Sequence, residues 1–298
     1  MVHHSVCPLC SSEMIGVELN CLDHFVSGKT FAVCRCSVCN FMFTQDYPLE
    51  SEIGQYYESD EYISHSDTYK GLTNKLYRVA RGIMLKRKKN LIVNITRLKT
   101  GNLLDIGSGT GYFASTMKNA GWVAKGIEIN EKAREFSRSH FGIKVGTPDQ
   151  VSTMKTESFD CITLWHVLEH FQDPFAYISE IYRLLKPGAF CFIALPNCSS
   201  YDAKSYESFW AAWDVPRHLW HFNPDTFRLF SEHYGFTLES LRILPLDVFY
   251  ISLMSEKYKD SILPFFKGIA KATGFAFFSF FNRKRSSSVI YILRKPIG

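Results

Sequence analysis

The sequence predicts an α/β fold in which a parallel β-sheet carries helices on both faces, preceded by a small cysteine-rich module. From residue 101 onward, short apolar segments alternate with helical segments, which is the pattern of a parallel sheet. The first apolar segment ends in a run of glycines, as strands do before a ligand-binding turn. Two Cys-x-x-Cys pairs near the start of the chain predict the cysteine-rich module.

Length and composition are those of a globular protein with one large domain and a smaller unit. The 298 residues are 46% hydrophobic and 21% charged, which excludes a largely disordered chain. The net charge of +5 is too weak to predict nucleic acid as a partner. The first residues lack the features of a secretory signal, and the longest apolar run, GFAFFSFFN, has charges at both ends. We therefore expect a cytoplasmic protein whose thiols are reduced.

Residues 1–46 are expected to form a zinc ribbon. Its predicted ligands are the four cysteines of the two pairs, Cys7, Cys10, Cys36 and Cys39. Each Cys-x-x-Cys turn presents two sulfurs on one side, and zinc takes four in a tetrahedron, so the metal would be structural. Cys21 with His24, and the additional Cys34, leave a different ligand set open.

Residues 47–100 are expected to form a tyrosine-rich segment followed by a basic helix. Four side chains of this segment are candidates for folding over a ligand or for plain packing: Tyr56, Tyr57, Tyr62 and His65. Between residues 70 and 104 there is no acidic residue, and the apolar residues recur at helical spacing. A solvated charged helix face is the plain interpretation, and contact with RNA, an anionic lipid head group or an acidic acceptor is the alternative.

From residue 101 the predicted elements follow in a regular order. Strands are expected at 102–109, 123–129, 159–167, 189–197, 237–246 and 287–295. Helices are expected at 112–121, 131–142, 174–185, 226–235 and 262–281. The last strand comes after a long aromatic-rich excursion and is expected to close the edge of the sheet as an antiparallel partner.

The most informative residues form the glycine-rich turn DIGSGTG, which follows the first strand and precedes a helix. Glycine lets a backbone bend and approach a ligand without steric cost. A dinucleotide fingerprint needs glycine where this chain has Tyr112, so the turn argues against NAD and suits a ligand without pyrophosphate. The second strand ends in Glu128, whose carboxylate can accept hydrogen bonds from two ribose hydroxyls.

Residues 101–196 resemble the class I S-adenosylmethionine-dependent methyltransferases. The similar motifs are LLDIGSGTGYFA, GIEIN, FDCITLWHVLEHFQDP and LLKPGAFCFIALPN, and HVLEH is similar to a subgroup that includes ubiquinone-biosynthesis-type O-methyltransferases. The resemblance implies a Rossmann-like seven-stranded sheet whose last strand is antiparallel, with S-adenosylmethionine as the cofactor. It also implies the residues that bind this cofactor, namely Asp105, Gly107, Ser108, Gly109, Gly111, Glu128, Ile129, Asp149 and Trp165.

By this resemblance, Asp105 would orient the methionine amino group, Glu128 would hold the ribose and Asp149 would contact the adenine. Many relatives have a Gly-Asp pair at this last position, where the present chain has the sequence TPDQ. Trp165, at the end of a strand, would face the sulfonium and the acceptor.

A methyl acceptor must be aligned, and a hydroxyl or acidic carbon must also lose a proton. Four histidines lie in segments expected near the acceptor: His166, His170, His218 and His221. His166 leaves the carboxyl end of a strand, where doubly wound sheets bind their ligands, so we predict it as the base. His218 or His221 would assist. Two aromatic insertions, at about residues 198–222 and 247–285, are expected to form a lid over the acceptor.

The predicted function is transfer of a methyl group by the domain at 101–298 to an oxygen or carbon of a small metabolite, sugar or lipid precursor. Two alternatives are an RNA base methyltransferase that grips RNA with the ribbon and the basic helix, and a non-catalytic zinc-ribbon binding protein. The expected partner is a small-molecule methyl acceptor, and nucleic acid is not expected. Contact with an anionic membrane surface through residues 262–281, and the oligomeric state, are left open by the sequence.

Overall fold

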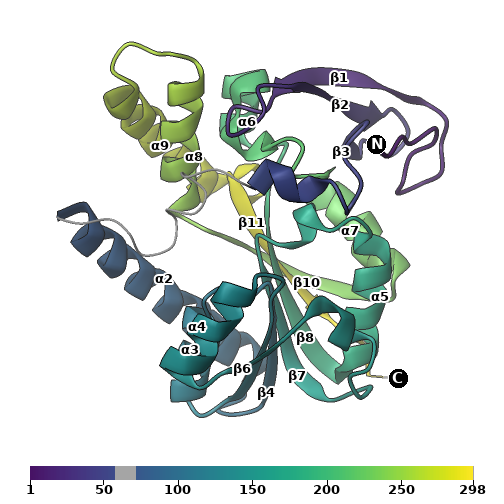
Figure 1. The fold of residues 1–298 in the computed structure, drawn as a ribbon, viewed down its shortest axis with the longest axis vertical. Helices are drawn as coiled ribbons and strands as arrows, with labels where there is room; N and C mark the ends of the chain where they lie inside the picture. The colour runs from purple at the N-terminus through teal and green to yellow at the C-terminus, as the bar shows by residue number, and fades with distance from the viewer. Residues whose placement is uncertain (58–71, 298) are drawn as a thin grey trace.

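The computed structural model describes residues 1–57 and 72–297, which are built around a seven-stranded sheet (Figure 1). The strand order is β10-β11-β8-β7-β4-β5-β6. The strands are β4 (Asn102–Ile106), β5 (Val123–Ile127), β6 (Lys144–Gly146), β7 (Phe159–Trp165), β8 (Leu185–Pro196), β10 (Thr237–Ile243) and β11 (Ser288–Arg294).

Pairing in this sheet is parallel from β8 to β6, whereas β11 is antiparallel to both of its neighbours. The predicted seven-stranded sheet with an antiparallel last strand is confirmed. The expectation that this strand closes the edge is wrong, because β11 lies between β8 and β10 and the edge strand is β10. After the insertion, β11 pairs with β8 on one side and with β10 on the other, so β10 forms the edge of the sheet.

Helices cover both faces of the sheet, as predicted. On one face α2 (Leu72–Thr96), α3 (Tyr112–Asn119) and α4 (Glu131–Phe141) pack side by side, and on the other face lie α5 (Pro174–Leu184) and α7 (Pro224–His233) (Figure 1). The side chains of Asn130, Asp173 and Asn223 accept hydrogen bonds from backbone N–H groups in the first turns of α4, α5 and α7. Each such cap stabilises a helix start by about 1 kcal/mol.

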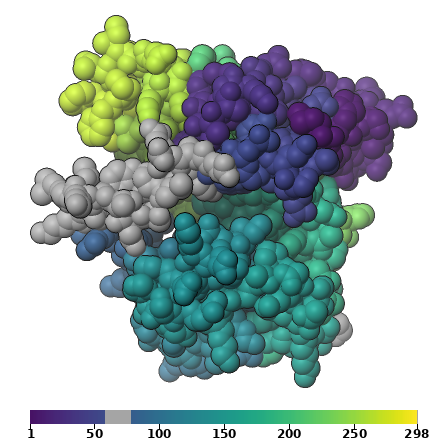
Figure 2. All heavy atoms as spheres, viewed as in Figure 1, coloured from purple at the N-terminus to yellow at the C-terminus, as the bar shows by residue number. Residues whose placement is uncertain are grey.

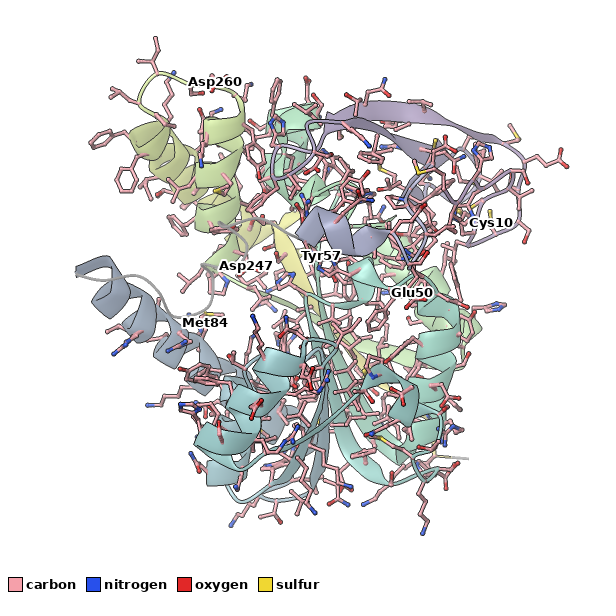
Figure 3. All side chains as sticks on the ribbon, in the orientation of Figure 1. Cys10, Glu50, Tyr57, Met84, Asp247 and Asp260 are labelled. Atoms are coloured by element: carbon pink, nitrogen blue, oxygen red, sulfur yellow. The ribbon has the colours of Figure 1, made fainter. Side chains whose placement is uncertain are left out.

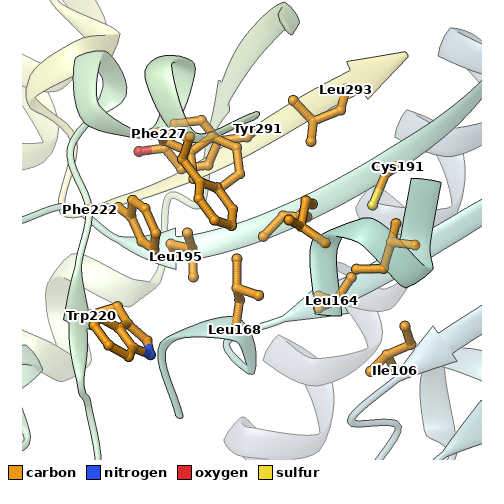
Figure 4. Packing of buried hydrophobic residues seen from close by; sticks show 14 of the residues in the cluster. Ile106, Leu164, Leu168, Cys191, Leu195, Trp220, Phe222, Phe227, Tyr291 and Leu293 are labelled. Carbon is orange, nitrogen blue, oxygen red and sulfur yellow. The ribbon is translucent and has the colours of Figure 1, made fainter. Parts of the chain in front are cut away.

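Alternate residues of the central strands supply two separate cores. In β4, Leu104 belongs to the core beneath α5 and α7, while Leu103 belongs to the core beneath α2 and α3. In β11, Tyr291 and Ile292 divide in the same way, since successive strand residues point to opposite faces. Figure 4 shows the first of these cores, in which Tyr291 stacks on Phe227 with ring centroids 3.9 Å apart.

A second, four-stranded antiparallel sheet lies above the carboxyl edge of the large one (Figure 1). Three of its strands come from the ribbon, and they are β1 (Ile15–Leu22), β2 (Thr30–Cys36) and β3 (Met42–Thr44). The fourth, β9 (Trp220–His221), comes from the lid segment, residues 198–222, and pairs with β3. The remaining elements of the lid segment are α6 (Tyr201–Tyr206), η4 (Glu207–Phe209) and η5 (Ala211–Trp213). The ribbon and the lid segment therefore share one sheet.

A buried arginine also ties the ribbon to the lid segment. Arg217 is 2% exposed, and its guanidinium donates to Asp23 of the ribbon at 3.0 Å and to Asp214 at 2.7 Å. A further nitrogen of this side chain donates to the backbone carbonyl of Tyr56 at 2.9 Å, in η1 (Ile53–Tyr57). The two carboxylates and the carbonyl compensate the buried cation, so that three separate parts of the chain depend on it.

The insertion between β10 and β11, residues 247–285, is a helical hairpin. It consists of α8 (Asp247–Tyr258), α9 (Pro264–Phe281) and η6 (Arg283–Arg285). The sequence predicts α9 but not α8. Figure 2 shows the hairpin as a lobe that stands out from the body of the molecule beside the ribbon. Among the described residues, none of the helices combines the length and the apolar character that a membrane span requires.

Candidate functional site

The glycine turn between β4 and α3 has the backbone that the sequence predicts. Gly107, Gly109 and Gly111 have φ values of +68°, +51° and +79°, in the left-handed region that favours glycine. A Cβ atom at Gly107 would collide with Val167, and one at Gly111 would collide with Ser137. At Gly109 a Cβ atom would meet nothing within 4 Å. Packing thus requires glycine at positions 107 and 111. At position 109 the described residues leave the space beside the backbone unoccupied, so that a ligand can approach it.

Glu128 lies beside this turn, directly after β5. Its carboxylate accepts hydrogen bonds from the backbone N–H groups of Gly109 at 2.8 Å and Asn130 at 2.9 Å. Ile129 follows with a side chain that is 75% exposed, and Asp149 is exposed in η2 (Pro148–Val151), after the neighbouring strand β6. The predicted ribose and adenine contacts therefore follow one another along the carboxyl edge of the sheet.

Asp105 is buried near the end of β4, under the glycine turn. Its Oδ1 atom accepts a hydrogen bond from the hydroxyl of Thr163 at 2.6 Å. Burial raises the pKa of Asp105 to about 7, although the Thr163 hydrogen bond and the Lys88 ammonium act in the opposite direction. At neutral pH this carboxyl is close to its ionisation midpoint, so an added positive charge would favour its ionised form.

Lys88 of α2 is a site residue that the sequence-based prediction missed. Its Nζ atom lies 4.1 Å from the centre of the Trp165 ring, at the end of β7. Burial lowers the pKa of Lys88, and the charges of Asp247 and Asp105 partly offset this effect. The basic helix therefore turns one cation inward to the carboxyl edge of the sheet.

One signal in the sequence could have identified Lys88. On α2 it shares a stripe with Met84, Leu91 and Ile95, which are spaced by three or four residues and pack against the core. A lysine within an otherwise apolar helix stripe has to find a buried acidic partner or an aromatic ring.

His166 directly follows β7 with a left-handed backbone, φ +59°. Its Nε2 atom lies 2.8 Å from Oδ2 of Asp247, and its Nδ1 atom lies 3.4 Å from Oε1 of Glu169. Burial alone would lower the pKa of His166, but the two carboxylates outweigh it and raise this pKa to about 10. Both ring nitrogens of the resulting imidazolium face carboxylates, so in this arrangement His166 has no lone pair with which to accept a proton.

Asp247 is the second site residue that the sequence-based prediction missed. It is the first residue of α8 and lies 81 residues after His166 in the chain. Figure 3 shows Asp247 above the carboxyl edge of the large sheet, at the base of the helical hairpin. The insertion at residues 247–285 thus contributes the carboxylate of Asp247 to the site.

Glu169, His170 and His218 form a second polar cluster beside the first. One ligand atom from each of them lies within 4.8 Å of the others. Glu169 is 1% exposed, and among the described residues its oxygens have no hydrogen bond beyond the longer contact with His166. Burial would raise the pKa of Glu169, but the hydrogen bond from His166 and the nearby His218 and His170 lower it, so the carboxylate is ionised.

Backbone carbonyls fix the orientation of both histidines in this cluster. Nδ1 of His170 lies 3.1 Å from the carbonyl oxygen of Arg217, and Nδ1 of His218 lies 2.9 Å from that of Ala212. Since a carbonyl only accepts, both Nδ1 atoms carry a proton. Burial and the neighbouring His218 lower the pKa of His170 to about 4, so its Nε2 keeps a lone pair. Two imidazoles oriented in this way beside a carboxylate are able to hold a proton or a divalent cation.

The tyrosine-rich segment reaches this cluster through Tyr57, which Figure 3 labels. The hydroxyl of Tyr57 lies 3.1 Å from Nδ1 of His170. Tyr56 is buried and packs in the ribbon-facing core, with its ring 6.0 Å from that of Phe31. The other two candidates of this segment, Tyr62 and His65, lie outside the described residues.

His221 is held at the junction of ribbon and lid segment. It is 4% exposed, its Nε2 lies 2.9 Å from the hydroxyl of Thr44, and its ring packs edge-on against Trp213. Burial lowers the pKa of His221 to about 3, so the ring is neutral. Whereas His170 and His218 contact each other, with ring centroids 4.5 Å apart, His221 is engaged in joining two strands.

The tryptophans of the lid segment are packed and hydrogen-bonded. The indole nitrogens of Trp210, Trp213 and Trp220 donate at 2.6 to 2.7 Å to Asp202, to the carbonyl of Glu207 and to the carbonyl of Phe171. All three side chains are at most 3% exposed. Trp210 and Trp213 pack against each other in the lid segment, whereas Trp220 packs against Phe41 of the ribbon and Phe175 of α5.

The four predicted zinc ligands converge at the end of the ribbon, where Figure 3 labels Cys10. The sulfurs of Cys7 and Cys39 are 3.6 Å apart, as are those of Cys10 and Cys36. Zinc–sulfur bonds of about 2.3 Å in a tetrahedron require sulfurs about 3.8 Å apart, so the set fits this metal. The alternative pair is not part of this cluster: Cys21 is buried in the core between ribbon and lid segment, and His24 stacks on Tyr258 with centroids 4.2 Å apart.

The two knuckles are alike in their backbone. The residue after the second cysteine of each pair, Ser11 or Asn40, has a left-handed conformation with φ near +60°, at 59° and 62°. In each knuckle a backbone N–H also donates to the carbonyl of the first cysteine, Cys7 or Cys36. Such repeated turns bring two sulfurs to the same side, as four-sulfur coordination requires.

Comparison with known proteins identifies the large domain. Residues 80–241, more than half of the chain, match the family described as Methyltransferase domain. The chain belongs to this methyltransferase family. The match begins in α2 and ends in β10, so it spans the glycine turn, Glu128 and the histidine cluster of this methyltransferase.

Curated relatives narrow the comparison. The chain is similar to the ubiquinone biosynthesis O-methyltransferases of Thiobacillus denitrificans, at 31% identity over 111 residues, and of Paracidovorax citrulli, at 31% over 115 residues. These alignments cover 35% and 36% of the chain, and 47% and 48% of the relatives. The chain thus spans about half the length of the curated relatives it matches.

Among solved structures, the cyclase SpnF has a TM-score of 0.51 and 19% identity, over 71% of this chain and 81% of the other. At this identity the likeness shows a common fold and nothing about chemistry. The family match and the sheet confirm the methyltransferase recognised from the sequence. The roles of the individual site residues stay predictions.

Proposed function

We propose that this methyltransferase uses S-adenosylmethionine to methylate an oxygen of a small hydroxylated molecule. The observation that carries the proposal is the geometry at Gly109. Among the described residues, apart from its chain neighbours, no atom lies within 4 Å of the place where a Cβ atom would stand, and the backbone N–H donates a hydrogen bond to the carboxylate of Glu128. A nucleoside placed there would have its ribose hydroxyls against Glu128 and its base toward Asp149. Both contacts lie at the carboxyl edge, where ligands of such sheets bind.

The charges around the end of β7 suit a cationic cofactor. Asp105, Asp247 and Glu169 supply three carboxylates, while Lys88 and His166 supply two cations. When all five are ionised, the group carries one net negative charge. A sulfonium is a positive charge that disappears as the methyl group leaves, so this negative site favours binding of the cofactor over its demethylated product.

In the proposed reaction the acceptor oxygen bonds to the methyl carbon while the carbon–sulfur bond breaks, and the hydroxyl proton is lost. The cofactor supplies the activated methyl group, and the chain has to align the acceptor and take up the proton. The predicted base, His166, is held as an imidazolium by Asp247 and Glu169. We assign proton uptake to His218, whose Nδ1 atom is engaged by the carbonyl of Ala212, because burial lowers the pKa of the neighbouring His170 to about 4 and makes it the weaker base.

The choice of an oxygen acceptor is supported by the curated relatives, which are named O-methyltransferases. The ribbon is proposed to hold a structural zinc ion on Cys7, Cys10, Cys36 and Cys39, which would supply cross-linking and no chemistry.

Cofactor binding is tested first by titration calorimetry with S-adenosylmethionine and its demethylated product. Glu128→Gln should weaken binding by about 10-fold to 100-fold, since a hydrogen bond to a charged group contributes about 1.5–3 kcal/mol. Glu131→Gln, an exposed change on α4, is the matched control and should bind as the wild type does. Failure of the wild type to bind either ligand would refute the proposed function.

Transfer is then tested with labelled S-adenosylmethionine and a panel of phenols, catechols and sugars. Two chemistries can use the donor set of Glu169, His170 and His218: proton transfer to a histidine, or a divalent cation that lowers the pKa of the acceptor hydroxyl. Dialysis against EDTA separates them. A metal-free protein with unchanged turnover supports the histidine base, and restoration of turnover by Mg²⁺ alone refutes it.

A further inference from the structure

The helix α9 has its large apolar side chains on the outside. Gly268, Ala272 and Ser279 form its buried face, and at Gly268 a Cβ atom would already be 3.0 Å from Leu253 of α8. The outward face carries large apolar side chains that are 55% to 73% exposed, at Phe265, Phe266, Phe277, Phe278, Phe280 and Phe281. In a water-facing helix the apolar side packs inward, so this arrangement is the reverse of the ordinary one.

Positive charge accompanies these phenylalanines. Residues 257–285 contain seven lysines and arginines and one acid, Asp260. Among the described residues Lys284 has a partner in Asp225 and Lys271 has one in Glu256, while Arg283 forms no ion pair. An apolar aromatic face bordered by basic side chains is the composition of helices that lie in the surface of an anionic membrane.

A cationic cavity opens beside this face, between α2 and the strands β10 and β11. Its volume is about 610 Å³, and four basic side chains line it: Arg87, Lys88, Arg242 and Arg283. No acidic residue of the described chain lines it, and Leu244, Ile290 and other apolar side chains form its wall. Phe280 belongs both to this wall and to the exposed face of α9, so the two features are continuous.

The phenylalanine face of α9 and the cationic cavity beside it together favour an anionic membrane over a second copy of the chain. A second copy of the chain would bring its own basic residues against this face, and like charges repel. A bilayer with anionic lipids offers phosphates to the arginines and hydrocarbon to the phenylalanines at the same time. The hairpin stands out from the body of the molecule, so that a flat surface can reach it (Figure 2).

We propose that the outward face of α9 docks onto an anionic membrane surface and that the phosphate of one lipid head group enters the cavity lined by Arg87, Arg242 and Arg283. The phenylalanines enter the boundary between head groups and acyl chains. The docking residues Arg87, Arg242 and Arg283 and the phenylalanines of α9 are not assigned to cofactor or acceptor, and only Lys88 belongs both to the cavity lining and to the charged group at the end of β7.

Flotation of the full chain with vesicles tests the proposal. Phosphatidylcholine vesicles containing phosphatidylglycerol should carry the protein, and pure phosphatidylcholine vesicles should carry much less. Arg87→Gln with Arg283→Gln should lower the partition coefficient about 25-fold, at about fivefold for each basic residue near the surface. Lys86→Gln with Lys89→Gln removes two charges from α2 outside the cavity and is the matched control.

If the cavity captures a head group, the first pair of substitutions weakens binding clearly more than the control pair. Equal losses would show a diffuse attraction and would overturn the head-group site. Circular dichroism and thermal unfolding of each variant confirm that it remains folded.

The aromatic contribution is tested by Phe277→Ser with Phe281→Ser. Each of these two substitutions should weaken partitioning roughly tenfold, because the variant no longer transfers that phenylalanine side chain from water into the bilayer. Leu229→Ser on α7, 50% exposed on another part of the surface, is the control and should partition as the wild type does. Unchanged flotation of the double variant, or a concentration-dependent dimer that these substitutions abolish without any flotation of the wild type, would overturn the proposal.

Discussion

Replacing Asp247 by asparagine removes the carboxylate that lies 2.8 Å from Nε2 of His166 and keeps the size of the side chain. The two neighbouring carboxylates raise the pKa of His166 to about 10, although burial acts in the opposite direction. The imidazole side chain is 34% exposed, and solvent screens charges at that exposure. We therefore expect Asp247→Asn to lower this pKa by on the order of 1–2 units, each worth about 1.4 kcal/mol.

The sign of the effect on stability follows from the raised pKa. The ion pair stabilises the folded chain fully below the unfolded pKa of histidine, about 6.5, and the stabilisation is lost as the pH rises through about 10. At the acid end the pair is lost again as the pH falls through the lowered pKa of Asp247. The variant should be less stable than the wild type near neutral pH and should approach it in strongly alkaline solution.

The assay is an NMR titration of the His166 Cε1 proton, combined with urea unfolding at several pH values. Asp225→Asn, at an exposed pair on α7, is the control and should leave the titration of His166 unchanged. The reasoning is refuted if His166 titrates with the same pKa in the wild type and in Asp247→Asn.

Three further outcomes are expected. Reduced protein should carry about one zinc ion per chain, and Cys36→Ser should release it, as measured by atomic emission; retention of zinc by the variant would contradict the assigned ligands. Arg217→Met leaves the buried carboxylate of Asp23 and the half-buried one of Asp214 without their cation and should cost about 3–5 kcal/mol in urea unfolding, whereas a cost below about 1 kcal/mol would argue against a structural role. Phe230→Ala should cost about 3–5 kcal/mol by leaving a cavity in the core, while Leu229→Ala beside it should stay within about 0.5 kcal/mol.

The large sheet could be predicted from the sequence because each of its strands is marked by residues that are adjacent in the chain. The segment around Leu103 and Leu104 is apolar on both sides, as a strand covered on two faces must be. The glycine turn could be predicted for the same reason, since left-handed backbone angles leave few choices other than glycine. The four cysteines of the ribbon are likewise recognisable from spacing alone.

The charged part of the site could not be predicted because it depends on distant segments. Asp247 reaches His166 across 81 residues, and no local pattern marks it as a partner. The consequence is chemical, since a histidine that the sequence favours as a base becomes an imidazolium once the insertion folds over it. The basic neighbours of Lys88 along the chain favour a solvated helix face, yet tertiary packing turns its side chain inward to the ring of Trp165.

The strand pairing between β3 and β9 has a consequence for how the chain is divided. A cut after residue 46 would separate two hydrogen-bonded partners, the hydroxyl of Thr44 and the ring of His221, which lie 177 residues apart in sequence. The ribbon is therefore not an exchangeable appendage. His218, to which proton uptake is assigned by proposal, lies two residues before β9. If the four cysteines hold the proposed zinc ion, its removal should therefore weaken acceptor binding before the large sheet is disturbed.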